Sequence, residues 1–318
     1  WVSGELRAQL DTEFWFVAPE VWANHGDEPI MFRFSTSDAP ATVTLEMPAN
    51  PAFAPLVVNI GANAAVSLNM TPYMEDVENR PANLVLQKGI HITSTSDISC
   101  YYEIDNDLNA DLFVLKGSNA LGTEFLLPFQ TQLTNHFPEA PASFDIVATE
   151  DNTVVTIVPT EDLIGHPAGV AFDVVLNAGQ TYGCRAAGLS GPAHPAGTSV
   201  TSSAPVAITI ADDSAEQFAN NQLCFDLIGD QITPITEAGV EFIAQRGALA
   251  TNERIFILAT TDGTGITQNG TPLLGNLNAG ETLSLQLTTP TLHIATTEPV
   301  LIFQVTGFGC EVGGGLLP

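Results

Sequence analysis

LNAGQTY, residues 176–182, recurs about a hundred residues later as LNAGETL, residues 277–283. Each copy lies between two short runs rich in Val, Leu and Thr, which are typical of β-strands. The tripeptide Asn-Ala-Gly favours a tight turn, because Gly adopts positive φ without a steric penalty. The repeated string therefore predicts a strand–turn–strand hairpin that the fold uses more than once.

A weaker copy of this hairpin occurs earlier, in PLVVNIGANAAVSLNM, residues 55–70. There Asn63 takes the place of Gly179 and Gly280, and Asn is the other residue that readily adopts positive φ. A ligand-binding loop used repeatedly is the alternative explanation. Three copies at similar spacing favour a structural turn at these three residues.

The strings around the hairpin also repeat in the same order, with a period of about 100–110 residues. No segment keeps helical spacing over three turns, and short alternating runs predict an all-β fold. We expect three tandem β-sandwich-like repeats packed with pseudo-threefold symmetry, and a β-propeller-like grouping of the strands is the alternative. The expected repeats are residues 1–110, 111–223 and 224–318, and they open with TEFWFVAP (12–19), GTEFLLPF (122–129) and GVEFIAQR (239–246).

The chain has 318 residues, of which 45% are hydrophobic, so it can bury a large core. It carries 36 Asp and Glu against 8 Lys and Arg, a formal net charge of −28. Such an acidic chain is not expected to bind nucleic acid, because phosphates require cations. No run approaches the roughly 18 apolar residues of a membrane helix, so membrane insertion is not expected either. The chain begins with Trp1, and we expect it to be a segment of a longer protein.

Four cysteines, Cys100, Cys184, Cys224 and Cys310, are too far apart for a CxxC metal motif. An even number in a chain with few lysines indicates an exported protein with up to two disulfides, and buried free thiols are the alternative. Three pairings are possible. The related positions of Cys224 and Cys310, after the last strands of repeats two and three, favour that pair. Cys100 and Cys184 then form the second.

DNDLNAD, residues 105–111, places Asp105, Asp107, Asn109 and Asp111 at alternating positions. Hard oxygen ligands at this spacing are typical of the first half of a calcium loop. The sixth position is Ala rather than Gly and the twelfth is Lys rather than Glu, so the loop is not an EF-hand. The spacing predicts a Ca²⁺ site at these four residues, and a solvated acidic loop is the alternative.

Catalytic motifs do not emerge from the sequence. GLSG at 188–191 is not a nucleophile elbow, and the six histidines form no paired ligand motif. Glu13, Glu124 and Glu241 recur in the opening strand of each repeat. Repetition by symmetry favours a structural role for them over catalysis. We therefore expect that the protein is not an enzyme.

Several of these strings together resemble the IgGFc-binding protein N-terminal domain family. The resemblance is closest over residues 85–318 and looser over 12–84, and it rests on strings that occur in the family's order: GSNALGTEFLLPF, SFDIVATEDNTVVTI, LNAGQTY, CFDLIGDQITP and VTGFGCEVGGGLLP. It implies an extracellular, mostly β module. The acidic, lysine-poor composition is more similar to bacterial members, which look like large secreted surface proteins. The family provides no catalytic residues to carry over, and the Fc ligand is not carried over to this chain.

These observations predict a secreted cell-surface adhesion or binding module, which recognises glycan or protein through loops and the insertion at 69–84. The alternative is a structural subunit of a surface filament or layer. Such a subunit would bind copies of itself through edge strands at 1–16 and 307–318.

Overall fold

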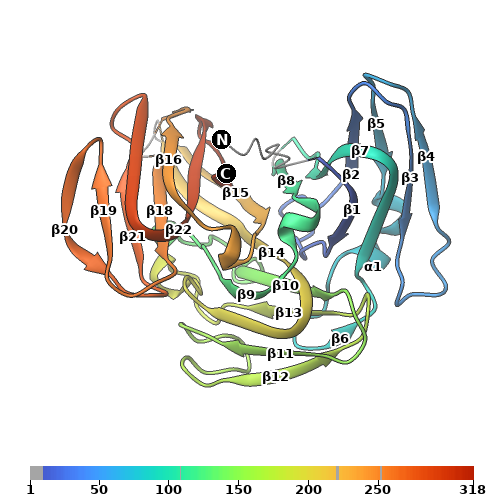
Figure 1. The fold of residues 1–318 in the computed structure, drawn as a ribbon, viewed down its shortest axis with the longest axis horizontal. Helices are drawn as coiled ribbons and strands as arrows, with labels where there is room; N and C mark the ends of the chain where they lie inside the picture. The colour runs from blue at the N-terminus through green and yellow to red at the C-terminus, as the bar shows by residue number, and fades with distance from the viewer. Residues whose placement is uncertain (1–9, 108, 220–221, 251–252) are drawn as a thin grey trace, which may run out of the picture.

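In the computed structural model, the described part of the chain comprises residues 10–107, 109–219, 222–250 and 253–318. Within these ranges the fold is almost entirely β, with one short α-helix, α1 (Met74–Val77), and four single 3₁₀ turns. The turns are η1 (Thr71–Tyr73), η2 (Gly117–Ala120), η3 (Gly191–Ala193) and η4 (Ile235–Glu237). None of the helices described is long and apolar enough to cross a membrane. Figure 1 shows three groups of strands that follow one another along the chain.

The strands divide into three units with matching membership. Unit 1 contains β1 (Asp11–Phe16), β2 (Ile30–Thr36), β3 (Ala41–Glu46), β4 (Leu56–Ile60), β5 (Ala65–Asn69), β7 (Ile90–Ile104) and β8 (Asp111–Leu115). Unit 2 contains β9 (Gly122–Leu126), β10 (Ala142–Ala148), β11 (Thr153–Val158), β12 (Phe172–Leu176), β13 (Thr181–Arg185), β14 (Ser199–Ala219) and β15 (Gln222–Gln231). Unit 3 contains β16 (Gly239–Gln245), β18 (Arg254–Ala259), β19 (Thr264–Gln268), β20 (Thr271–Leu277), β21 (Thr282–Gln286), β22 (Thr291–Gly309) and β23 (Glu311–Leu316). Two short strands, β6 (Val85–Leu86) and β17 (Ala248–Leu249), complete the set.

All three sheets have the same strand order. It is β4-β3-β7-β2-β5 in unit 1, β12-β11-β14-β10-β13 in unit 2 and β20-β19-β22-β18-β21 in unit 3. The first half of the long strand β7 pairs with β1 and β3, and its second half pairs with β2 and β8. Because one long strand takes part in both layers, each unit is a small two-layer sandwich. The predicted all-β sandwich repeats are therefore confirmed, and a unit is not a single propeller blade.

Hydrogen bonding places the ends of the units later than the expected boundaries. The strand β8 pairs with β7, so that Leu115 lies opposite Cys100 and the strand belongs to unit 1. The strand β15 pairs with β14 as far as Gln231, within unit 2. The sheets of units 1 and 2 thus extend to residues 115 and 231, whereas the sequence pattern placed divisions at 110 and 223.

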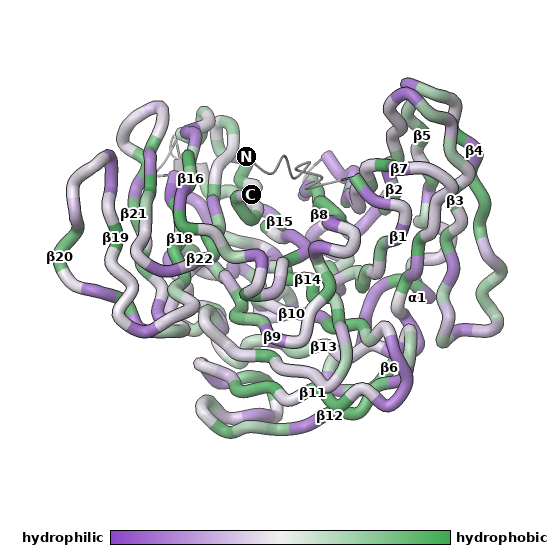
Figure 2. Tube along the Cα trace, viewed as in Figure 1, coloured by the Kyte–Doolittle hydropathy of each residue, from purple (hydrophilic) through white to green (hydrophobic). Residues whose placement is uncertain are grey.

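Each unit has a core between its two layers, and the core of unit 2 continues into unit 3 through Phe256, Phe303 and Val312. Inward positions alternate with outward ones, as in β3, where Ala41, Val43 and Leu45 are buried and the residues between them are partly exposed. Apolar and polar segments accordingly interleave along the strands in Figure 2. The core of unit 1 is rich in aromatic rings, and the centroids of Phe32 and Tyr102 are 5.4 Å apart in an edge-on contact.

The turns predicted from LNAG have the expected positive φ, but the predicted hairpin pairing is wrong, because the strands on either side of each turn pair with other strands, as β12 does with β11 and β13 with β10. Asn63, Gly179 and Gly280 have φ of 52°, 76° and 82°. They lie between β4 and β5, β12 and β13, and β20 and β21. Two of these turns also form joints between units. The carbonyl oxygen of Gly179 accepts the N–H of Gly89, at 3.0 Å. A Cβ on Gly197 would lie 2.1 Å from the carbonyl oxygen of Gly280. The repeated string thus marks both a turn and a contact with the preceding unit.

The insertion at 69–84 closes the joint between units 1 and 2. Asn79 is fully buried, donates to Asp145 Oδ1 at 2.8 Å and accepts from the hydroxyl of Thr181 at 2.7 Å. The guanidinium of Arg185 lies 3.1 Å from the same Asp145 oxygen, and β6 pairs with β13. The side chain of Asn79 is therefore satisfied by unit 2. Its buried part is an internal clamp and not the open binding loop that the sequence suggested.

Candidate functional site

The last strands of the three units meet side by side, with β15 between β8 and β23. Their contacts include carboxyl groups that accept backbone N–H groups of a neighbouring unit. Asp111 accepts from Gly229 at 2.8 Å, and Asp226 accepts from Val312 at 3.0 Å. The acidic composition of the chain is thus used in part to hold its units together.

Asp230 makes the most extensive of these contacts. One carboxylate oxygen accepts the N–H of Val114 in unit 1 at 3.1 Å, and the other accepts the N–H of Leu316 in unit 3 at 2.9 Å. The ammonium of Lys116 lies 2.8 Å from the second oxygen and also donates to the carbonyl oxygen of Gln231. The Lys116 side chain is only 10% exposed. A buried charge of each sign is therefore neutralised at the meeting point of the units.

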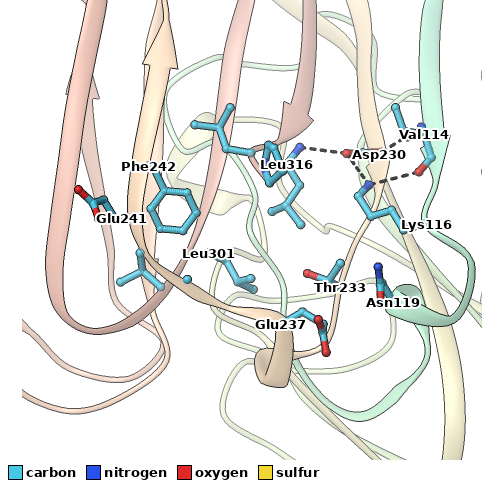
Figure 3. A pocket seen from close by; sticks show the side chains of 14 residues that line it. Val114, Lys116, Asn119, Asp230, Thr233, Glu237, Glu241, Phe242, Leu301 and Leu316 are labelled. Carbon is cyan, nitrogen blue, oxygen red and sulfur yellow. Dashed lines mark hydrogen bonds and ion pairs between the residues drawn. The ribbon is translucent and has the colours of Figure 1, made fainter. Parts of the chain in front are cut away.

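A cavity of about 320 Å³ lies beside this ion pair. Its lining is mostly apolar and comes largely from unit 3, with Phe242, Leu301 and Leu316 prominent in Figure 3. Lys116 and Asp230 line the opposite side in the same view. An apolar lining with a few polar groups around it is the usual character of a ligand pocket.

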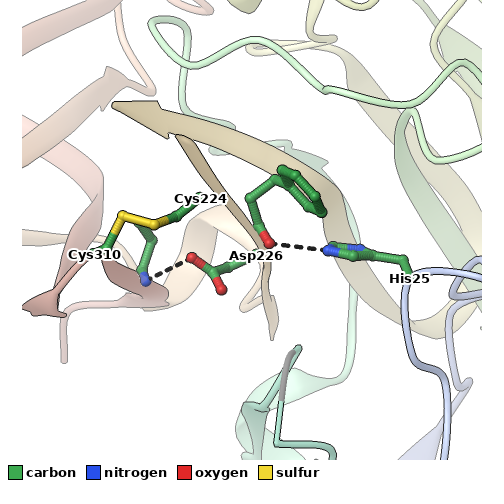
Figure 4. Close-up of a disulfide and its surroundings, with 6 residues drawn as sticks. His25, Cys224, Asp226 and Cys310 are labelled. Atoms are coloured by element: carbon green, nitrogen blue, oxygen red, sulfur yellow. Dashed lines mark hydrogen bonds between the residues drawn. A yellow bond between two sulfur atoms is a disulfide. The ribbon is translucent and has the colours of Figure 1, made fainter. Parts of the chain in front are cut away.

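A second candidate is the surface formed by the tips of two long hairpins, β14–β15 and β22–β23. The disulfide Cys224–Cys310 joins them, as the sequence predicted for one of its two bridges (Figure 4). Close to it, Phe218 is 66% exposed and Phe308 is 76% exposed. Leu223, opposite Phe218 in the ladder, is also exposed. We call Phe218, Leu223 and Phe308 the hairpin-tip surface. Exposed aromatic side chains near a covalent constraint are typical of binding surfaces.

Two ionisable side chains, His25 and Asp226, lie at the base of the β14–β15 hairpin. His25 Nδ1 lies 2.5 Å from Asp213, and Nε2 lies 2.9 Å from the carbonyl oxygen of Phe225. Burial favours the neutral ring, but the hydrogen bond and charge of Asp213 outweigh it, so the pKa of His25 is raised. Both ring nitrogens face acceptors, which suits the doubly protonated imidazolium. Figure 4 shows Asp226 between His25 and the disulfide. Burial, together with nearby Glu311, raises the pKa of Asp226 to about 7.

Three of the four residues of the predicted calcium loop have separate partners. Asp105 forms an ion pair with Arg33 at 2.7 Å, whereas Asp107 is exposed. Buried Asn109 accepts the N–H of Leu227, and Asp111 accepts that of Gly229 as described above. Among the residues that the structure describes, no group of three or more His, Cys, Asp or Glu is arranged to hold a metal ion. Calcium binding by this loop stays a prediction, and it would require Asp105 and Asp111 to exchange these partners for the ion.

The remaining two cysteines are free thiols. Cys100 lies in the core of unit 1, on β7, and Cys184 lies in the core of unit 2, on β13. The second bridge expected from the even count is therefore absent. Each side chain faces the interior of its own sandwich, so the two sulfurs occupy different cores. Burial raises the pKa of both thiols, which makes them inert.

The repeated glutamates have structural partners in two of the units. Glu13 lies 2.9 Å from Nε2 of His91, and Glu241 lies 2.9 Å from Nε2 of His293. In unit 2 the corresponding place opposite the opening strand is held by Ser199. The sequence singled out these glutamates but did not pair them with the histidines, because the register of β1 on β7 and β16 on β22 decides which side chains meet.

Sequence reasoning missed Asp226, Asp230 and the hairpin-tip phenylalanines. The signal available was weak: an aspartate two positions after Cys224, and phenylalanines close to cysteines in two repeats. Nothing in that pattern reveals that Asp230 links unit 2 to units 1 and 3, since its partners, two backbone N–H groups and the ammonium of Lys116, are far from it in the sequence. Exposure of Phe218 and Phe308 likewise depends on how far the two hairpins project.

A search of curated proteins gave no match. Among solved structures, a calcium-binding mutant of Bacteroides uniformis beta-glucuronidase 2 aligns with 78% of this chain at 10% identity and a TM-score of 0.20. The chain spans 30% of that protein's length. The lipid-containing bacteriophage PM2 structure aligns with 92% of this chain and 85% of its own, at 11% identity and a TM-score of 0.15. Neither score is high enough to establish a shared fold.

A protein-family comparison is informative. The family described as IgGFc binding protein matches residues 111–314. That range begins at the first residue of β8 and covers units 2 and 3, including the hairpin-tip surface and the disulfide. Unit 1 lies almost wholly outside it, in agreement with the greater divergence of the first repeat. The family suggests an extracellular binding module. With nearly two thirds of its length matched, the chain belongs to the IgGFc binding protein family.

Proposed function

We propose that this chain is an extracellular, non-catalytic binding module that recognises a protein partner through the hairpin-tip surface. The observation that carries the proposal is the exposure of Phe218 and Phe308, at 66% and 76%, on two hairpins joined by Cys224–Cys310. Aromatic side chains held on a rigid support bind with little loss of conformational entropy. The family description, which names binding of a protein, supports a protein ligand over a glycan. A disulfide supports an oxidising, extracellular setting.

The negative charge of the chain is expected to favour some protein partners over others. The chain has a formal net charge of −28, so long-range repulsion would exclude acidic partners and favour basic ones. Salt would weaken the association by screening these charges. We therefore propose a partner that presents an apolar patch within a neutral or basic surface.

The test uses the whole chain immobilised against a panel of extracellular proteins that includes immunoglobulin Fc, and in parallel against a glycan array. The double variant Phe218→Ser, Phe308→Ser is expected to lose about tenfold or more in affinity, because each aromatic contact is worth about 1 kcal/mol or more. Val57→Ser is the matched control, since Val57 is 59% exposed on unit 1, away from the hairpins. A ligand that binds the parent protein, the double variant and Val57→Ser with equal affinity would show that the hairpin-tip surface is not the binding site. Binding to the glycan array and to none of the proteins would show that the ligand is a glycan and not a protein.

A second candidate is self-assembly, now through a different edge strand. The strand β23 is unsuitable because Asp226 and Asp230 already bond to its Val312 and Leu316 N–H groups. Residues 1–9 of the other expected edge lie outside the described residues. The strand β20 is an edge of its sheet, and Leu274 on it is fully exposed. Light scattering over a concentration series tests this. Assembly should disappear in Leu274→Lys, and a monomer at every concentration would exclude it.

A further inference from the structure

A β-bulge in β14 gives two neighbouring aspartates different histidine partners. The pairing of β14 with β15 is shifted between Asp212 and Ala215, and both Asp212 and Asp213 are buried. A bulge re-aims one side chain of a strand relative to the next. Asp212 lies 3.4 Å from His194 of its own unit, whereas Asp213 meets His25, which comes from the loop between β1 and β2. The bulge therefore joins the base of the β14–β15 hairpin to unit 1.

The backbone of the bulge is strained. Ser214 has φ of 57°, in the left-handed region that a residue with a side chain adopts only at an energetic cost. Such a conformation persists where the surrounding contacts hold it. The N–H of His136 donates to the carbonyl oxygen of Ser214 at 2.8 Å, and the N–H of Trp22 donates to Asp213 at 2.9 Å. Trp22 belongs to the same loop as His25, so contacts from unit 1 help to hold the strained bulge.

His25 makes both of its contacts only when its ring carries two protons. Nδ1 lies 2.5 Å from Asp213, and Nε2 lies 2.9 Å from the carbonyl oxygen of Phe225 on β15 (Figure 4). Both partners are oxygen acceptors, and a neutral imidazole has a single N–H donor. Loss of one proton therefore sets a nitrogen lone pair against an oxygen and removes one of the two links from unit 1 to the hairpin.

The charged groups around His25 determine the direction of its titration. They are Asp27 on the same loop with Arg80 beyond it, Asp213 and Glu216 on β14, Asp226 on β15, Glu311 on β23, and His136 between β9 and β10. Burial lowers the pKa of His25, but the hydrogen bond and the charge of Asp213 raise it by more, so the net pKa is above the usual 6.5. The stabilising contribution of His25 is thus complete below about pH 6.5 and is lost as the pH rises through the folded-state pKa.

Asp226 ionises in the same range of pH. Burial, together with the neighbouring Glu311, raises its pKa to about 7. Once ionised, Asp226 adds a negative charge that favours the imidazolium of His25. The release of the His25 proton is therefore delayed to a higher pH by the carboxylate of Asp226.

The hairpin that His25 contacts carries Phe218 and Leu223 of the hairpin-tip surface. We propose that His25 is a proton-controlled latch, which fixes the β14–β15 hairpin to unit 1 as the imidazolium and releases it from unit 1 as the neutral ring. The latch itself requires no ligand. Its consequence rests on the proposed function: a partner at the hairpin-tip surface binds less tightly above neutral pH, because a released hairpin loses more conformational freedom on binding.

Hydrogen exchange of the hairpin amides measures the latch without a ligand. Protection factors, which correct for the intrinsic effect of pH on exchange, are compared at pH 6 and pH 9 for Ala215–Phe218 and Leu223–Phe225. We expect protection to fall about tenfold or more at pH 9, the usual effect of losing a hydrogen bond to a charged group. All proteins carry Glu78→Gln, since burial raises the pKa of Glu78 to about 8 and would add a second pH dependence. Equal protection at both pH values would overturn the proposal.

Two histidine variants identify the group that titrates. His25→Asn keeps an N–H donor near Asp213 but does not titrate, so its hairpin protection should be the same at pH 6 and pH 9. His91→Asn is the matched control, because His91 also lies between two acceptors, Glu13 on β1 and Glu46 on β3. It should keep the full decrease in protection. A decrease that survives in His25→Asn would exclude His25 as the latch.

Asp226→Asn decides the question if His25→Asn does not fold. Removing this negative charge should move the midpoint of the protection loss to lower pH, by about half a unit or more. An unchanged midpoint would contradict the proposed coupling of Asp226 to His25.

Affinity measurements separate the latch from the proposed function. A partner that needs Phe218 and Phe308 should bind the parent about threefold or more weakly at pH 9 than at pH 6, and His25→Asn equally at both. Equal affinity of the parent at both pH values would refute the regulation and leave the proposed function standing. A pH-dependent protection of the hairpin in a protein that binds no partner would support the latch and count against the proposed function.

Discussion

The ammonium of Lys116 in unit 1 lies 2.8 Å from the carboxylate of Asp230 in unit 2, and that carboxylate also accepts a backbone N–H from unit 3. Side-chain exposure is 10% for the lysine and 4% for the aspartate. A buried pair contributes little net stability relative to apolar residues, but losing one partner leaves the other charged and desolvated. The pair therefore makes the three units depend on one another.

Asp230→Ala is expected to lower the free energy of unfolding by about 3–5 kcal/mol. The substitution leaves the buried Lys116 ammonium without its counter-ion and two backbone N–H groups without their acceptor. Guanidinium unfolding followed by circular dichroism measures this. Asp107→Ala is the control, since Asp107 is exposed and its removal should change stability by less than about 0.5 kcal/mol. Equal midpoints for the two variants would show that Asp230 does not couple the units.

The disulfide closes a separation of 86 residues. In the chain-entropy model, its removal costs about 4–5 kcal/mol of stability. We expect Cys224→Ser, Cys310→Ser to unfold at a clearly lower temperature. Alkylation with mass spectrometry should add no group to the native protein and two groups to the unreduced, unfolded protein, one each at Cys100 and Cys184. Four groups, or none, after unfolding without reductant would contradict this assignment.

The glycine joint between units 2 and 3 offers a controlled comparison. Gly197 and Gly270 have nearly equal φ, 80° and 79°, so alanine strains the backbone equally at both, by about 1–2 kcal/mol. A Cβ on Gly197 would also collide with the Gly280 carbonyl oxygen, whereas one on Gly270 would meet nothing within 4 Å. Gly197→Ala should therefore be less stable than Gly270→Ala by a further 1–3 kcal/mol or so. Thermal unfolding of both variants measures the difference, and equal losses would mean that the joint adapts freely.

The repeat order and the turns could be predicted because they depend on local signals. Asn63, Gly179 and Gly280 need positive φ, and only a few residue types supply it cheaply. The function of the 69–84 insertion could not be predicted, since its buried polar residues, such as Asn79, find their partners in unit 2.

The candidate site was predictable only in part, for a similar reason. Related positions in two repeats indicated the pair Cys224 and Cys310. The separation of Cys100 from Cys184, and the reuse of Asp111 as a contact to unit 2, depend on how whole sandwiches pack. Sequence spacing contains no information on that packing.

Glu78 predicts a pH dependence. Its carboxylate is fully buried beside Arg80, and burial raises its pKa from 4.5 to about 8. Between these values the folded protein holds a proton that the unfolded chain releases. The contribution of Glu78 to the free energy of unfolding is therefore fully present below about pH 4.5. This contribution is lost as the pH rises towards 8. The loss amounts to a few kcal/mol at most, since each pH unit between the two pKa values contributes about 1.4 kcal/mol.

The measurement is thermal unfolding of the protein and of Glu78→Gln at pH 5 and pH 8. The variant should be more stable than the parent at pH 8 and nearly equal to it at pH 5, because glutamine keeps the hydrogen-bonding shape without an ionisable proton. Glu75→Gln is the matched control, as Glu75 is an exposed residue of α1, the helix that Glu78 directly follows, and also contacts Arg80. Asp226, whose pKa is also raised, to about 7, should leave part of the slope in the variant. A parent protein that is equally stable at both pH values, or a variant with an unchanged slope, would show that Glu78 is ionised in the folded state.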